Sequence, residues 1–134
     1  MNETVKAKWV EALRSGDYQQ GRYALATGKN PERPSSFCCL GVLCDLAVKE
    51  GVIPPPEHMY PTDEFLYVRN GIVLPEAVTA WAELPPTAWE GSKKEFRNDN
   101  GAFINASGER SALSSLNDDG HPFTSIATVI EENF

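Results

Sequence analysis

Apolar residues recur at helical spacing near the start of the chain. Val5, Trp9 and Leu13 lie four positions apart and form one apolar stripe along residues 2–15. A stripe of this kind predicts an amphipathic helix with one buried face. Gly16 follows directly, at the position where helices commonly end in a left-handed residue.

The most apolar segment of the chain is residues 39–50, which has little polar face. A helix that is apolar on nearly every side is central and buried, and Gly51 is placed to end it. Three shorter helices are expected: one that opens at Pro75, one over residues 111–117, and a last one capped by Thr124.

Short strands are predicted between these helices. The strongest hairpin signal is Asn100-Gly101, between residues 95–99 and 102–106, and Asn70-Gly71 is a second turn signal. The other predictions are a strand over 22–27, of which 23–25 could pair with 36–38, a proline-rich loop over 54–63, and a strand over 65–69, along which 72–74 could return. Together these elements predict a single α+β domain over residues 1–134, with a small antiparallel sheet packed on the central buried helix and flanking N- and C-terminal helices.

Composition narrows the classes of protein. The chain has 134 residues, with 19 acidic and 12 basic side chains and a net charge of -7. This balance argues against a protein that binds nucleic acid through its phosphates. No apolar run approaches the roughly 20 residues of a membrane span, and the N-terminus lacks the basic flank and apolar core of a signal peptide. We therefore expect a cytoplasmic protein without membrane association.

Three cysteines, Cys38, Cys39 and Cys44, lie within seven positions. An odd, crowded set does not form a disulfide framework, and it lacks the spacing of a zinc site. Cys38 and Cys39 are expected at the start of the central helix, where a thiol is activated. A cysteine hydrolase would then need His58 or His121 as its base. The favoured interpretation is that the cysteines are buried structural residues.

The acidic residues and the known motifs offer no catalytic centre. Asp45 is the only charged residue between Leu40 and Val48 of the central helix, so it faces a hydrated edge or pairs with a buried arginine, and the first is favoured. The sequence contains no phosphate-binding loop, no dinucleotide fingerprint and no metalloprotease motif. We therefore predict no metal, no cofactor and no catalytic residue.

Arginines lie beside aromatic and amide side chains near the ends of the predicted strands. Arginine binds phosphate, aromatic rings stack on bases, and asparagine reads base edges, so this mixture suits a nucleotide pocket. The alternative is an ordinary hydrated surface. The candidate ligand-binding residues are Arg22, Tyr23, Arg69, Asn70, Trp89, Arg97, Asn98 and Arg110.

Several segments resemble a small protein family found in bacteriophage and prophage genomes. The resemblance rests on residues 8–21, 37–46 (FCCLGVLCDL), 113–120 (LSSLNDDG) and 123–131, and on Val73-Leu74-Pro75 with Trp81. It implies a small accessory protein that acts on a host component, such as a host protein or a nucleotide signal of antiphage immunity.

Three hypotheses follow. The first is a non-enzymatic homo-oligomer that binds and sequesters a small nucleotide-like host signal. The second is an inhibitor of a host protein, which would present the loop from Pro54 to Pro61 or Trp89. The third is a cysteine-dependent hydrolase that uses Cys38 or Cys39. We favour the first hypothesis because arginine, aromatic and amide side chains occur together without a catalytic constellation.

Overall fold

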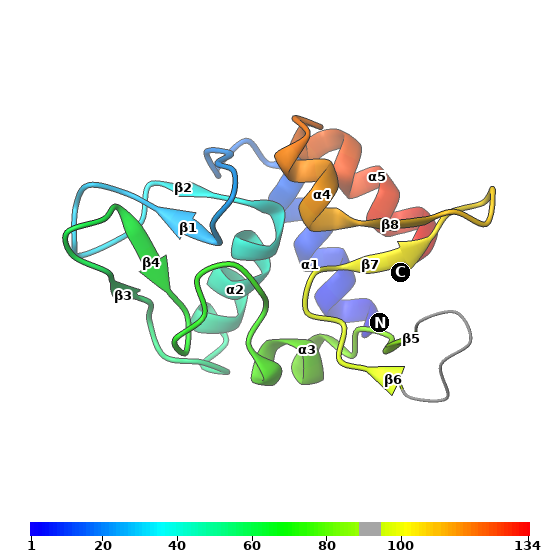
Figure 1. The fold of residues 1–134 in the computed structure, drawn as a ribbon, viewed down its shortest axis with the longest axis horizontal. Coiled ribbons are helices and arrows are strands. Elements are labelled where there is room, and N and C mark those ends of the chain that lie inside the picture. The colour runs from blue at the N-terminus through cyan, green and yellow to red at the C-terminus, as the bar shows by residue number, and fades with distance from the viewer. Residues whose placement is uncertain (89–94) are drawn as a thin grey trace.

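A computed structural model describes residues 1–88 and 95–134. Within this part of the chain, helices and short antiparallel strands alternate, as the predicted α+β class requires (Figure 1). The helices are α1 (Glu3–Arg14), α2 (Cys39–Lys49), α3 (Glu76–Ala82), α4 (Leu113–Asp118) and α5 (Phe123–Asn133). The strands are β1 (Ala26–Thr27), β2 (Ser36–Phe37), β3 (Glu57–His58), β4 (Glu64–Leu66), β5 (Thr87–Ala88), β6 (Glu95–Phe96), β7 (Ala102–Ile104) and β8 (Arg110–Ala112).

Helix α1 confirms the helix predicted at the N-terminus. The side chain of Asn2 caps it by accepting a hydrogen bond from the Val5 amide at 3.0 Å. Val5, Trp9 and Leu13 form its buried face. The Trp9 indole also donates to the Cys39 carbonyl at 2.9 Å, which links α1 to the start of α2 without leaving a buried donor unpaired.

Helix α2 is the buried centre of the fold, as predicted (Figure 1). It lies against the backbone of the segment before β1. A Cβ atom added at Gly41 would lie only 1.7 Å from the Leu25 carbonyl oxygen. The same oxygen accepts a hydrogen bond from the Cys38 amide at 3.1 Å. Glycine at position 41 is therefore required by this close approach of a helix to a neighbouring chain segment.

Asp45 lies at the hydrated edge of α2, as favoured from the sequence. Its carboxylate accepts a hydrogen bond from the Tyr18 hydroxyl and pairs with Lys49 at 3.2 Å. The Asp45 side chain is about a quarter exposed. A hydrated carboxylate with two partners needs no buried arginine.

Four strands form one antiparallel sheet in the order β2-β1-β4-β3. Ala26 is opposite Phe37 on one side and Phe65 on the other. Residues 36–38 were predicted to pair with 23–25, but β2 pairs with residues 26–27 instead, and both strands are shorter than expected. Strand β3 lies inside the segment predicted as a proline-rich loop. Its two residues pair with β4, but a strand this short shows no alternation of apolar and polar residues from which it could be predicted.

The turn after β4 comes two residues earlier than predicted. Val68 and Arg69, not Asn70-Gly71, occupy its two central positions, with φ angles of +49° and +67°. Tyr67 and Asn70 exchange backbone hydrogen bonds of 2.8 and 2.9 Å across it. Two consecutive left-handed residues match the twist of a hairpin. Because a β-branched valine rarely adopts this conformation, the position of this turn could not be predicted from the sequence.

The hairpin predicted around Asn100-Gly101 is wrong. Strand β6 pairs with β5, and β7 pairs with β8, so β6 and β7 are not partners. Asn98 is 2% exposed, and its amide both donates to and accepts from the Ala102 backbone, at 2.9 and 2.8 Å. Gly101, at φ +72°, packs closely against Leu113. The end of β6 and the start of β7 are therefore connected through the Asn98 side chain and not by a ladder of backbone hydrogen bonds.

Asn117 connects three parts of the chain. Its side-chain oxygen accepts hydrogen bonds from the Cys39 amide at 3.1 Å and from the Gln20 side chain at 3.0 Å. Its amide nitrogen donates to the Gly21 carbonyl at 2.8 Å. Since Asn117 is fully buried, these bonds satisfy groups that water cannot reach.

The C-terminal helix α5 packs against α1. It begins at Phe123 with Pro122 at the capping position, so Thr124 lies in its first turn and does not cap it as predicted. Ile126 and Ile130 are fully buried against the core. The predicted arrangement of a central helix, a small antiparallel sheet and two flanking terminal helices is confirmed.

Candidate functional site

A groove of about 940 Å³ is lined by residues of β6, β7 and β8 and of the segments next to them. These three strands lie on the right in Figure 1. The groove has the size of a small-molecule site. The described residues that line it include apolar side chains, two arginines, one acidic side chain and several small polar groups. The lining residues used below are Phe96, Arg97, Asp99, Phe103, Arg110 and Phe134.

Aromatic side chains give the groove an apolar surface anchored on the core. The rings of Phe103 and Phe134 contact edge to face at a centroid distance of 5.8 Å, and both pack against the buried core. Phe96 is 38% exposed, and Ile104 is 63% exposed. Exposed rings beside a groove can stack on a planar ligand.

Two arginines line the same groove from different strand pairs. Arg97 follows β6, and Arg110 begins β8. Arg97 forms an ion pair with Asp99 at 3.6 Å, and both side chains are more than a third exposed. Because an exposed ion pair contributes little stability, an incoming anion can replace Asp99 at small cost.

Asn98 lies between Arg97 and Asp99 but does not present its amide to a ligand. It is buried, and both ends of its amide are bonded to Ala102. This interaction holds the chain after β6 against the start of β7. We therefore assign Asn98 a positioning role for the two charged neighbours.

The other predicted arginines lie elsewhere. Arg22 packs against Gly120, and the Tyr23 amide donates to the Asp118 carboxylate at 2.9 Å. Arg69 and Asn70 belong to the turn after β4. These residues do not line the groove at β6–β8. Of the four predicted arginines, the structure brings only Arg97 and Arg110 together in it. Trp89 lies outside the described residues.

Phe103 and Phe134 are groove residues that the sequence did not single out as ligand contacts. Phe134 continues the apolar spacing of Ile126 and Ile130 along α5. That spacing was the available signal, but it predicts burial and not a place beside Arg97.

The three cysteines are buried, as the favoured interpretation expected. Cys38 does cap α2: its sulfur accepts a hydrogen bond from the Gly41 amide at 3.4 Å. Burial nevertheless raises the pKa of Cys38 to about 11 and raises the pKa of Cys39 well above its usual value. Such thiols are protonated at neutral pH and are poor nucleophiles.

Neither histidine approaches these thiols within the described residues. The His58 ring packs on Phe65 at a centroid distance of 5.0 Å, and the His121 backbone bonds to Leu116 and Gln20. No hydrogen bond joins a histidine to a cysteine in residues 1–88 and 95–134. A cysteine–histidine pair is therefore not assembled there.

Within residues 1–88 and 95–134, no three or more histidine, cysteine or acidic side chains lie together so that they could hold a metal ion. Among the same residues, no helix has the length and hydropathy needed to cross a bilayer.

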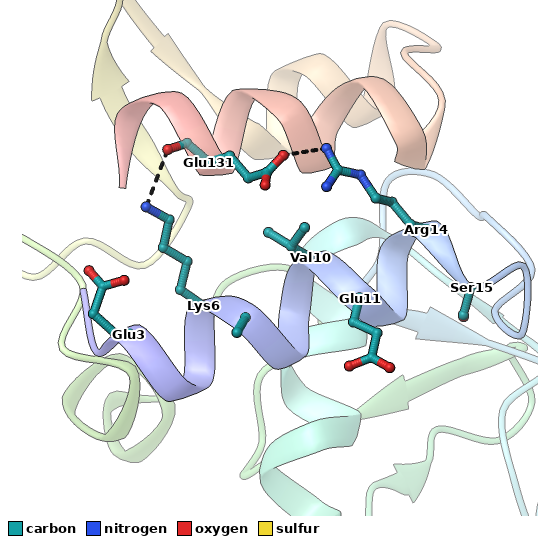
Figure 2. A pocket seen from close by; sticks show the side chains of 8 residues that line it. Glu3, Lys6, Val10, Glu11, Arg14, Ser15 and Glu131 are labelled. Atoms are coloured by element: carbon teal, nitrogen blue, oxygen red, sulfur yellow. Dashed lines mark hydrogen bonds and ion pairs between the residues drawn. The ribbon is translucent and has the colours of Figure 1, made fainter.

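A second groove, of about 730 Å³, lies between α1 and α5 (Figure 2). Lys6 and Arg14 reach across it to Glu131, and Ala7 and Val10 lie between them on α1. Its charged lining residues alternate in sign along α1, and none of the described residues that line it is aromatic. It therefore suits a small planar ligand less well than the groove at β6–β8.

The chain belongs to a family described as Domain of unknown function (DUF8296), whose family model matches residues 1–134. Comparison with curated proteins and with solved structures gave no match.

Proposed function

We propose that this protein binds a small nucleotide-like ligand in the groove at β6–β8 and sequesters it without chemical conversion. The single observation that carries this proposal is the meeting of Arg97 and Arg110 in one aromatic-lined groove. Guanidinium groups recognise phosphate through paired N–H donors. The neighbouring phenylalanines supply faces on which a base can stack.

The biological role follows from the resemblance to bacteriophage and prophage proteins. A phage-encoded protein that captures a nucleotide signal in the bacterial cytoplasm would suppress an antiphage response. Capture needs tight binding and no turnover. The protonated, buried thiols favour this role over a cysteine hydrolase.

Mass spectrometry of the protein from bacterial cells with active antiphage signalling tests capture directly. Native and denaturing spectra are compared, so that a ligand retained in the fold is released on unfolding. A released nucleotide supports the proposal and identifies the ligand class. Failure to retain one, together with no mass gain from a panel of mononucleotides and cyclic nucleotides, refutes it.

Substitution of single arginines tests the location. For a nucleotide that binds in that panel, Arg97→Gln and Arg110→Gln should each weaken binding about tenfold to a hundredfold, since a hydrogen bond to a charged group contributes about 1.5–3 kcal/mol. Arg22→Gln and Arg69→Gln are matched controls that remove the same charge away from the groove. Calorimetric titration measures all four. Equal losses in the controls would place the ligand elsewhere.

A second candidate function is inhibition of a host protein through the segment between β3 and β4. Tyr60 there is 85% exposed, and neighbouring Met59 is also exposed. Exposed aromatic side chains of this kind commonly anchor protein interfaces. A stoichiometric host protein retained by the wild-type chain and lost with Tyr60→Ser would favour this function.

A further inference from the structure

The groove between α1 and α5 is bordered by charged residues in a regular order. From the start of α1 they are Glu3, Lys6, Glu11 and Arg14, alternately negative and positive. Ala7 and Val10 lie at the centre of this series. Read in the opposite direction, the order of signs is reversed. An antiparallel copy of α1 therefore presents an opposite charge at each of the four levels.

The two acidic residues of this series have no ion pair within the described residues. Each of the two basic residues has more N–H donors than it uses in hydrogen bonds there. Lys6 donates once, to the Glu131 carbonyl at 3.2 Å. Arg14 uses one terminal nitrogen, on Glu131 and Thr128. Ammonium and guanidinium groups carry three and five N–H donors. Figure 2 shows Lys6 and Arg14 directed to α5 and Glu11 directed away from it.

We propose that a second copy of this chain packs its α1 antiparallel against α1 in this groove, forming a two-fold symmetric dimer. At 1.5 Å of rise per residue, Glu3 and Arg14 lie about 16 Å apart along the helix. Centring the pair between Ala7 and Val10 places Glu3 level with Arg14 of the second copy, and Lys6 level with its Glu11. The exposed methyl group of Ala7 permits a close approach of the helices.

The symmetry repeats each interaction. In a two-fold interface each surface meets itself, so every complementary pair occurs twice. Each exposed ion pair alone is weak and is screened by salt. The dimer is therefore concentration-dependent and dissociates more readily as ionic strength rises. No residue of α1 lines the ligand groove at β6–β8, so the two interactions do not depend on each other.

Sedimentation equilibrium of the full chain tests this dimer at low and high salt. The wild type should approach twice the monomer mass of 14.7 kDa as its concentration rises. Glu3→Arg places arginine level with Arg14 at two symmetric positions and should weaken dimerisation about tenfold or more. Combining Glu3→Arg with Arg14→Glu restores opposite charges and should restore the dimer. Thr4→Arg is the control, because Thr4 is exposed on the same turn but does not line the groove.

A second exchange of charges tests the same dimer without substituting Arg14, which bonds to α5 within its own chain. Glu11→Lys alone should weaken the dimer, and Glu11→Lys with Lys6→Glu should recover it, while circular dichroism verifies that every variant is folded. A wild type that stays monomeric at millimolar concentration overturns the proposal. So does a wild-type dimer that Glu3→Arg leaves unchanged, or that Thr4→Arg weakens equally.

Discussion

Replacing Gly41 by alanine tests the packing at the centre of the fold. In an isolated helix this change stabilises by about 1 kcal/mol. Here the new Cβ would lie 1.7 Å from the Leu25 carbonyl oxygen, whereas contacts below 3.0 Å are essentially never found. Helix α2 and the Leu25 backbone must therefore separate by about 1.3 Å. This movement stretches the 3.1 Å hydrogen bond from the Cys38 amide beyond its useful range.

The expected result is a net loss of stability. Strain from the added methyl group costs about 1–3 kcal/mol, and the broken buried hydrogen bond costs about 1–3 kcal/mol. After the gain in helix propensity, the free energy of unfolding should fall by about 1–5 kcal/mol. Since small domains have about 5–15 kcal/mol in total, the change is large.

Urea unfolding followed by circular dichroism measures the change. Gly21→Ala is the matched control, because its new Cβ would meet Ser36 at 3.2 Å, a contact that a small adjustment relieves. We expect a clear fall in the urea midpoint for Gly41→Ala and a much smaller change for the control. An unchanged or raised midpoint for Gly41→Ala would refute the close approach of α2 to Leu25.

Three further predictions concern buried polar groups and thiols. Asn117→Ala should lower the free energy of unfolding by about 2–4 kcal/mol, because the Cys39 amide and the Gly21 carbonyl lose a buried partner. Urea unfolding measures this free energy, and a decrease below about 1 kcal/mol would contradict the prediction. Iodoacetamide at pH 8 should leave Cys38 of the native protein unmodified and should alkylate it in urea, as mass spectrometry can show; complete native labelling would contradict its burial. Stability should also fall as pH rises from about 9 to about 11. The pKa of Cys38 is raised to about 11 in the fold, so its thiol ionises at a lower pH in the unfolded chain than in the folded one. A urea midpoint that stays constant or rises over this range would contradict this prediction.

The sequence predicted the helices better than the strands, for a physical reason. A helix of eleven or twelve residues repeats its apolar spacing several times, as Val5, Trp9 and Leu13 do in α1. The strands of this fold contain two or three residues each, so alternation has no length over which to repeat. Pairing is then decided by tertiary contacts such as the bond of Asn98 to Ala102.

The types of residue in the candidate site could be predicted from the sequence, but their positions in the fold could not. Arginines beside aromatic and amide residues were recognised, yet only Arg97 and Arg110 line the same groove. Their meeting depends on β6 and β8, which belong to different strand pairs. Asn98 looked like a ligand contact because a sequence pattern does not distinguish an exposed amide from one that is buried and bonded to the backbone.

The packing of α1 on α5 has a consequence for synthesis of the protein on the ribosome. Residues 3–14 are made before residues 123–133, which form the helix that they contact. Contacts between distant parts of a chain form late and slow the folding of a domain. The apolar face of α1, with Trp9 at its centre, must therefore stay without α5 until residues 123–133 have been made, and a chaperone that binds short apolar segments would find a target there.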